Sequence, residues 1–220
     1  MVEHFGVKIA NRKYAAKLVR EEFALINTKP SLPFFKELLE KGAYADEEGT
    51  AYKEEWCKEY REICLKNYDL NMRYFSLLDK DEFERELELF IKRHNGFEEI
   101  FDLNACDGEE GYYIMVLDAY KQTYIGKAYD IKKRIRKHWS NTLPFDRTLF
   151  PMYAYENSVF SIDFFRALDT TRIFAWKTKV QYGAESDLVA DFPTKFCANR
   201  IGGDVTDLLT ALATKTERAL

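Results

Sequence analysis

The chain has 220 residues, 46% of them hydrophobic, and a formal net charge of −4 at pH 7. That apolar fraction is ample for a packed core and excludes an intrinsically disordered chain. No apolar run approaches the length that spans a bilayer, and the N-terminal residues lack a signal peptide's basic and apolar regions. We therefore expect a soluble cytoplasmic protein without membrane contact, built as one large domain or two small ones.

The cysteines, Cys57, Cys64, Cys106 and Cys197, lack the paired spacing of a zinc site. Cys57 and Cys64 are two helical turns apart, about 10 Å along a helix axis, which is too far for a disulfide. Reduced thiols are therefore expected.

The first hundred residues show helical apolar spacing but no motif that carries chemistry. Helices are expected over residues 8–26, 31–39, 52–68, 70–78 and 79–94. In the last of these, Asp79-x-x-Glu82 resembles a capping box, Asn95-Gly96 is a stop signal, and His94 is interpreted as a core histidine. The loop 104–110 is the best boundary. It divides the chain into an α-helical region of unknown role, residues 1–104, and a second domain, residues 105–220.

Residues 111–138 predict a strand, a turn, a second strand and a helix. The apolar and aromatic run 112–117 suits a buried strand, and the short β-prone run 123–125 ends at Gly126. Residues 127–139 have helical spacing. The buried stripe of this helix comprises Ile131, Ile135 and Trp139.

Side chains that carry chemistry lie beside this stripe. At 100° per residue, Lys127, Arg134 and His138 fall within about 40° of one another on the expected helix. In a hairpin whose loop has two or four residues, Tyr113 and Tyr124 point to the same face, which the helix can cover. The sequence therefore predicts that two phenols, two cations and an imidazole gather at one point.

The later elements are less sharply defined. The apolar runs 145–152 and 159–165 are expected to form strands or short helices, and residues 171–177 a strand. Residues 204–220 are expected to form a closing helix.

The central stretch resembles the GIY-YIG nuclease superfamily. Gly111-Tyr112-Tyr113 stands where the family has Gly-Ile-Tyr, and Tyr124-Ile125-Gly126 is similar to its second signature. Eleven positions separate the signature tyrosines, ten more lead to Arg134, and four more lead to His138. These offsets fit the family pattern, and Tyr112 departs from it only at a structural position.

The family also has an acidic metal ligand on a later helix, and then an asparagine before a glycine-rich end. Glu185 lies in the short helical pattern A-E-S-D-L-V-A-D-F, and Asn199 follows fourteen residues later. The resemblance covers roughly residues 111–203. It implies an α+β fold, in which a small antiparallel-sheet GIY-YIG-like nuclease domain is flanked by helices and preceded by the α-helical region.

The resemblance implies a metal-dependent endonuclease that hydrolyses phosphodiester bonds of DNA by a one-metal mechanism. Glu185 is a hard oxygen ligand suited to Mg²⁺ or Mn²⁺. Tyr113 is the implied general base, and cations such as Lys127 or Arg134 would favour its phenolate form. Arg134 also offers a planar fork of donors to phosphate oxygens.

Supporting roles follow for three other residues. Tyr124 would position water or phosphate. His138, which is similar to the histidine of the homing and restriction branches, would relay a proton from Tyr113 or bind phosphate. Asn199 would hold the architecture of the site. It is also one of the residues expected to lie near the nucleic acid. Lys127 is similar to a lysine in the incision module of nucleotide-excision repair.

The net negative charge argues against a nucleic-acid partner, but the distribution of charge argues for one. Residues 121–147 contain eight lysines and arginines and two acids, whereas residues 79–118 contain thirteen acids. An acidic protein can still carry a local basic face. The residues expected to point away from the buried stripe, toward DNA phosphates, are Lys132, Lys133, Arg136 and Lys137.

Other interpretations stay open. Asp163 and Asp169 are candidate acids, although turn or cap roles are favoured for both. A second hypothesis is a non-cleaving nucleic-acid-binding module of the same fold, and a third is an α+β scaffold that binds protein through its acidic helical half. The specificity, the biological role (restriction, repair, mobile element or phage defence) and the oligomeric state, a dimer included, also stay open.

Overall fold

A four-stranded antiparallel sheet lies at the centre of the protein, in a computed structural model that describes residues 2–9, 16–23, 54–141, 148–149 and 158–199. The strand order is β3-β6-β4-β5. The strands are β3 (Glu98–Glu99), β4 (Gly111–Leu117), β5 (Gln122–Ala128) and β6 (Arg172–Lys177). A separate two-stranded hairpin is formed by β1 (Val2–His4) and β2 (Val7–Ile9).

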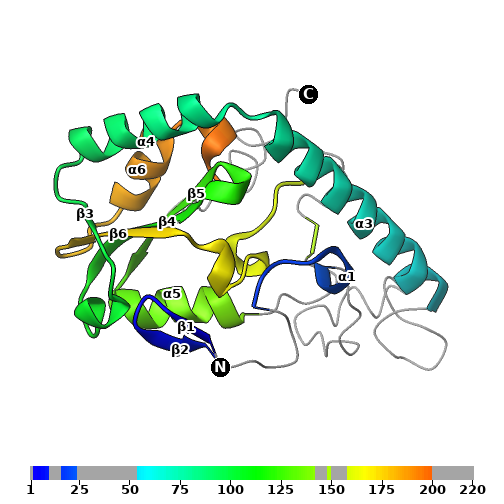
Figure 1. Ribbon diagram of the computed structural model, residues 1–220, viewed down its shortest axis with the longest axis horizontal. Coiled ribbons are helices and arrows are strands. Elements are labelled where there is room, and N and C mark those ends of the chain that lie inside the picture. The colour runs from blue at the N-terminus through cyan, green and yellow to red at the C-terminus, as the bar shows by residue number, and fades with distance from the viewer. Residues whose placement is uncertain (1, 10–15, 24–53, 142–147, 150–157, 200–220) are drawn as a thin grey trace.

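Helices cover both faces of the sheet (Figure 1). Helix α5 (Ile131–Ser140) lies on one face, and α4 (Lys80–Arg93) and α6 (Ala184–Asp191) lie on the other. All seven residues of β4 are buried, because both faces of this central strand are covered. The protein is therefore a mixed α+β structure with small antiparallel sheets.

The side chains of β4 alternate between two cores, as the two-residue period of a strand requires. Tyr113, Met115 and Leu117 pack in the core beneath α5. The other core, beneath α4 and α6, contains Tyr112, Ile114 and Val116 from the same strand.

The β4–β5 hairpin has the geometry that brings two tyrosines to one face. A four-residue connection, residues 118–121, joins the strands, and the register pairs Tyr113 with Gly126 and Met115 with Tyr124. Opposed residues of an antiparallel pair point to the same side. Tyr113 and Tyr124 therefore share the face that α5 covers, which confirms the prediction made from the loop length.

The helix expected over residues 127–139 begins later than predicted. Strand β5 continues through Gly126 to Ala128, and Asp130 caps α5 by accepting a hydrogen bond from the Lys133 backbone NH. Lys127 lies opposite Tyr112, on the sheet face away from α5. The predicted helical alignment of Lys127 with Arg134 and His138 is therefore wrong, because tertiary pairing extends the strand past its glycine.

The N-terminal half also differs from the expected all-helical region. Residues 54–77 form one continuous helix, α3 (Glu54–Leu77), where two were expected. Residues 7–9 are a strand instead of a helix start, and only α1 (Arg20–Phe23) is helical among the described residues of 8–26. The β-branched Val7 and Ile9 suit a strand, and the helical period alone did not reveal this.

Other expectations for this half are confirmed in part. The Asp79 carboxylate caps α4 by accepting a hydrogen bond from the Glu82 backbone NH at 2.7 Å, and α4 ends at Arg93, but the Glu82 carboxylate bonds to Lys195. His94 bonds to Asp191 at 2.7 Å and packs on Phe90, as a satisfied histidine should, but its side chain is 25% exposed and lies at the edge of the core.

Two of the later elements follow the predictions, whereas residues 148–149 of the run 145–152 form a bend and not a strand or helix. Residues 171–177 contain β6 and residues 159–165 contain a 3₁₀ turn. The five 3₁₀ turns described are Leu103–Cys106, Asp118–Tyr120, Ile162–Phe164, Ala167–Asp169 and Thr194–Phe196. The helices expected over 31–39 and 204–220, and most of the run 145–152, fall outside the described residues.

Both cores combine residues from the two sides of position 104. Phe83 and Phe90 of α4 pack with Ile114, and Tyr60 of α3 belongs to the same core as Tyr113. The division into domains at this position stays a prediction. Cys64, Cys106 and Cys197 are buried free thiols, as expected. Among the described helices, none has the length and apolarity needed to cross a membrane.

Candidate active site

Two phenols and an imidazole meet beneath α5. The Tyr113 hydroxyl lies 2.9 Å from His138 Nε2, and both side chains are buried. The Tyr124 ring lies edge-on to His138, with ring centroids 5.0 Å apart, and 6.1 Å from the Tyr113 ring. Strands β4 and β5 and helix α5 thus each contribute one aromatic side chain to the cluster.

Gly126 makes room for the Tyr113 phenol. A Cβ atom at position 126 would lie 2.5 Å from the Tyr113 hydroxyl oxygen and 2.6 Å from Cζ. Because Tyr113 is fully buried and protein interiors are close-packed, the neighbours of its ring would have to move with it. The position of the Tyr113 ring therefore requires a glycine at position 126.

Arg134 lies at the rim of this cluster. Arg134 is exposed, and its guanidinium interacts electrostatically with both Tyr113 and Tyr124. Burial opposes the charge, but the two phenol oxygens outweigh it and raise the pKa of Arg134. A charged, partly solvated fork beside two hydroxyls suits phosphate binding.

The phenols themselves are protonated at neutral pH. Burial raises the pKa of Tyr113 well above its ordinary value, and the opposing attraction of Arg134 is smaller. Burial, followed by the negative charge of Glu185, raises the pKa of Tyr124 to about 12. Arg134 favours the phenolate of Tyr113, as expected of a nearby cation, but the loss of hydration outweighs its attraction.

Glu185 lies near the same cluster, in the first turn of α6. It is 6% exposed, its charge raises the pKa of both phenols, and its Oε2 atom lies 3.9 Å from Lys127 Nζ. Lys127 thus reaches the site through this ion pair and not from the helix. The structure therefore places Tyr113, Tyr124, Arg134 and His138 together at the α5 side of the sheet, whereas Lys127 and Glu185 form an ion pair on the α6 side. The charge of Glu185 still acts on both phenols.

The donor set fits a divalent ion held by one carboxylate. Within the described residues, no group of three His, Cys, Asp or Glu side chains could share an ion. Glu185 offers hard oxygen atoms of the type that Mg²⁺ binds, and Mg²⁺ keeps several water ligands. Water and phosphate oxygens would therefore complete the shell.

Asn199 lies beneath the site and not at its surface. Its Oδ1 accepts from the Ile125 backbone NH at 3.0 Å, and its Nδ2 donates to the Ile125 carbonyl at 2.7 Å. The residue is 1% exposed. Asn199 pairs with the backbone of the edge strand β5 as a residue of a neighbouring strand would. This agrees with the architectural role expected of it. Its amide is turned away from any nucleic acid.

The outer face of α5 is basic, as predicted, with one exception. Lys133, Arg136 and Lys137 are exposed, whereas the Lys132 side chain is 16% exposed and bonds to Asp107 at 2.9 Å.

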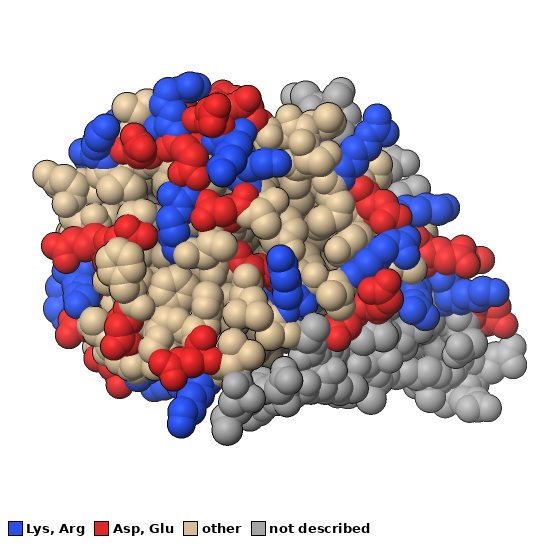
Figure 2. Space-filling view, in the orientation of Figure 1, with Lys and Arg blue, Asp and Glu red and all other residues tan. Residues whose placement is uncertain are grey.

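Helices α3 and α4 carry charges of both signs on the side shown in Figure 2. Blue and red side chains alternate along them, so these helices show no basic or acidic surface of one sign in that view.

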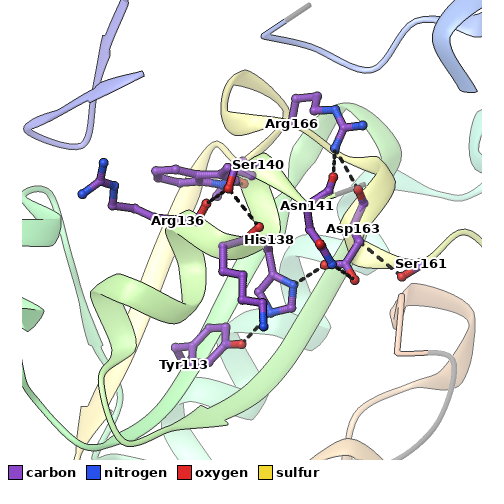
Figure 3. Close-up of polar contacts among 11 residues, drawn as sticks. Tyr113, Arg136, His138, Ser140, Asn141, Ser161, Asp163 and Arg166 are labelled. Atoms are coloured by element: carbon purple, nitrogen blue, oxygen red, sulfur yellow. Dashed lines mark hydrogen bonds and ion pairs between the residues drawn. The ribbon is translucent and has the colours of Figure 1, made fainter. Parts of the chain in front are cut away.

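Asp163 is the site residue that sequence reasoning misassigned. Its Oδ1 atom lies 2.6 Å from His138 Nδ1, so it contacts the imidazole instead of capping a turn (Figure 3). Asp169, by contrast, accepts from the Leu18 and Arg166 backbone NH groups and has the structural role expected of it. No local spacing links Asp163 to His138, 25 residues earlier, so only the fold reveals the contact.

No family model, curated protein or solved structure matches this chain.

Proposed function

We propose that this protein is a metal-dependent endonuclease that hydrolyses phosphodiester bonds of DNA. The observation that carries the proposal is the hydrogen bond between Tyr113 and His138, at a point where the charges of Arg134 and Glu185 both act on the Tyr113 phenol. A proton acceptor, a fixed cation and a hard carboxylate are the three groups that phosphodiester hydrolysis needs at one point.

Tyr113 and His138 carry out the proton transfer of the proposed reaction. The Tyr113 hydroxyl oxygen takes a proton from the attacking water while its own proton passes to His138 Nε2. The water oxygen bonds to phosphorus and one ester P–O bond breaks. The leaving alkoxide takes a proton from solvent, and the imidazolium returns its proton to solvent. Because both phenols are protonated at rest, this relay replaces a standing phenolate.

Charge on the phosphate is balanced by Arg134 and by an Mg²⁺ or Mn²⁺ ion that Glu185 would hold. When bound, the ion supplies Lewis-acid stabilisation of the phosphate oxygens. Tyr124 stands beside His138 and orients water or phosphate. Lys133, Arg136 and Lys137 would contact the DNA backbone from the outer face of α5.

The alternative is a nucleic-acid-binding module of the same fold that does not cleave. The exposed basic face of α5 supports binding in either case, because phosphate contacts need no catalysis. Cleavage assays separate the two functions.

The test is nicking of supercoiled plasmid DNA with and without Mg²⁺, in which we expect activity that EDTA abolishes. Tyr113→Phe, Arg134→Ala and Glu185→Gln should each lower the rate at least about 100-fold, since each removes a group that acts on the reacting atoms. The Mg²⁺ concentration giving half-maximal rate should also rise in Glu185→Gln.

Two matched variants serve as controls. Tyr112→Phe removes a hydroxyl from the neighbouring residue on the opposite sheet face, where it accepts from the Gln181 backbone NH at 2.8 Å. Asp187→Asn removes an exposed acid from the same helix as Glu185. Full activity in all three site variants, or no cleavage alongside tight DNA binding by the unmodified protein, would overturn the nuclease proposal.

A further inference from the structure

A second hydrogen bond continues the contact between Tyr113 and His138. His138 Nε2 lies 2.9 Å from the Tyr113 hydroxyl, and Nδ1 lies 2.6 Å from Asp163 Oδ1. Figure 3 shows the three side chains in line, from β4 through α5 to the 3₁₀ turn Ile162–Phe164. The exposed fractions of the His138 and Asp163 side chains are 3% and 18%.

The carboxylate of Asp163 is itself held in place. Its Oδ2 atom accepts from Asn141 Nδ2 at 3.0 Å. Arg166 Nη1 donates to the backbone carbonyls of Asp163 and Asn141, at 2.8 and 2.9 Å. Side chains fixed in this way hold one geometry, which is what an orienting group requires.

The charge states decide which way each hydrogen bond runs. Burial opposes ionisation of Asp163, but hydrogen bonds from His138 and Asn141 outweigh it, and the pKa of this carboxyl lies below its usual range. Burial also lowers the pKa of His138, so the imidazole is neutral at pH 7. A carboxylate only accepts hydrogen bonds, so Nδ1 must donate and Nε2 must carry the lone pair.

We propose that Asp163 is a positioning residue that fixes His138 in the Nδ1–H tautomer, with Nε2 aimed to accept the phenol proton of Tyr113. The inference rests on the proposed function, because it gives the relay its direction. When the proton arrives, Asp163 stabilises the imidazolium that forms. A buried carboxylate that holds a histidine in one tautomer leaves the unprotonated nitrogen of that histidine able to act as a base.

The first measurement needs no substrate. The chain has three histidines, so ¹⁵N-histidine labelling of the full-length protein gives few signals, and His138→Gln assigns the relevant one. In the unmodified protein at pH 7 we expect the His138 signals of the Nδ1–H tautomer. An Nε2–H tautomer would overturn the proposal whether or not any variant folds.

The second measurement is the variant Asp163→Asn. An asparagine amide can donate to Nδ1, so the Nε2–H tautomer would form and face Tyr113 with a proton instead of a lone pair. We expect the tautomer signals to switch and the plasmid-nicking rate to fall at least about 100-fold. Asp169→Asn is the control, since it changes a nearby buried carboxylate that bonds to Tyr120 and not to His138.

The pH profile separates positioning from a merely structural role. The relay needs neutral His138, so the nicking rate should fall as pH drops through the lowered pKa of this group. The charges that act on the imidazole are Asp163 from the 3₁₀ turn and Arg134 and Lys137 from α5 itself. Removing the negative charge of Asp163 lowers the pKa of His138 further, so the acid limb of Asp163→Asn should move to lower pH. An unmoved limb with unchanged tautomer would overturn the proposal.

The two proposals fail separately. If the unmodified protein does not cleave DNA but has the Nδ1–H tautomer, and Asp163→Asn switches it, the positioning role stands and the nuclease proposal falls. If the unmodified protein cleaves DNA and Asp163→Asn cleaves equally well, the nuclease proposal stands and the positioning role falls.

Discussion

Tyr113 and Gly126 face each other across the β4–β5 pair, and their contact explains why a glycine lies opposite this tyrosine. The phenol occupies the space that any Cβ atom at position 126 would need. Gly111 has a similar constraint, because a Cβ atom there would clash with the Trp176 carbonyl on β6. Gly126 thus makes room for the Tyr113 phenol, and Gly111 lets β6 approach β4.

The variant Gly126→Ala tests this contact. The added methyl group would displace the fully buried Tyr113 ring, and overpacking of this kind costs about 1–3 kcal/mol of unfolding free energy. We expect that loss in urea unfolding, together with a large fall in nicking rate. Gly108→Ala is the control: its φ of +73° makes alanine strained, but nothing lies within 4 Å of the new Cβ atom. Equal nicking rates in the two variants would contradict the steric account.

Helix α5 has two faces with different tasks. Its inward side carries Ile131, Ile135 and Trp139 into the core, and His138 with them. Its outward side carries Lys133, Arg136 and Lys137 into solvent. The same helix can therefore hold a relay group beneath the surface and present cations to a phosphate backbone above it.

The double variant Lys133→Ala with Lys137→Ala should weaken DNA binding. Each lost phosphate contact removes about 0.9 from the slope of log affinity against log salt, so the slope should flatten by about 2. Fluorescence anisotropy with labelled duplex across a salt series measures this. The control, Lys80→Ala with Lys92→Ala, removes the same charge from exposed positions of α4, across the sheet. Equal slopes in the two double variants would exclude α5 as the DNA-binding face.

At the scale of the molecule, the site depends on a sheet packed on both faces. Helix α6, which carries Glu185, packs against the sheet in the core beneath α4 and α6. Leu188 and Phe192 make this contact and pack near Phe90. The core beneath α5 holds Tyr113 and His138's helix. Helix α4 thus completes the layer that supports the carboxylate.

The variant Phe90→Ala tests this dependence. Phe90 is fully buried and its ring lies 5.2 Å from Phe192, so truncation should cost about 3–5 kcal/mol of unfolding free energy in urea titrations. Leu89→Ala, at the adjacent and 42% exposed position of α4, should cost less than about 1 kcal/mol. Similar values for the two variants would show that α4 does not share a core with the sheet.

Much of the local structure followed from the sequence, because its causes are local. A capping carboxylate at Asp79, a four-residue loop and a two-residue strand period need only neighbouring residues. They were enough to place Tyr113 and Tyr124 on one face and to put Arg134 and His138 on the helix that covers it.

Only the tertiary structure decided the rest. Pairing with β4 extends β5 past Gly126, so Lys127 belongs to the strand and not to the helix. Burial keeps both phenols protonated although Arg134 lies near them. The contact between His138 and Asp163 joins residues far apart in the chain, and no spacing rule relates them. Register, hydration and long-range contacts depend on the whole packed molecule, and therefore a pattern read along the chain does not contain them.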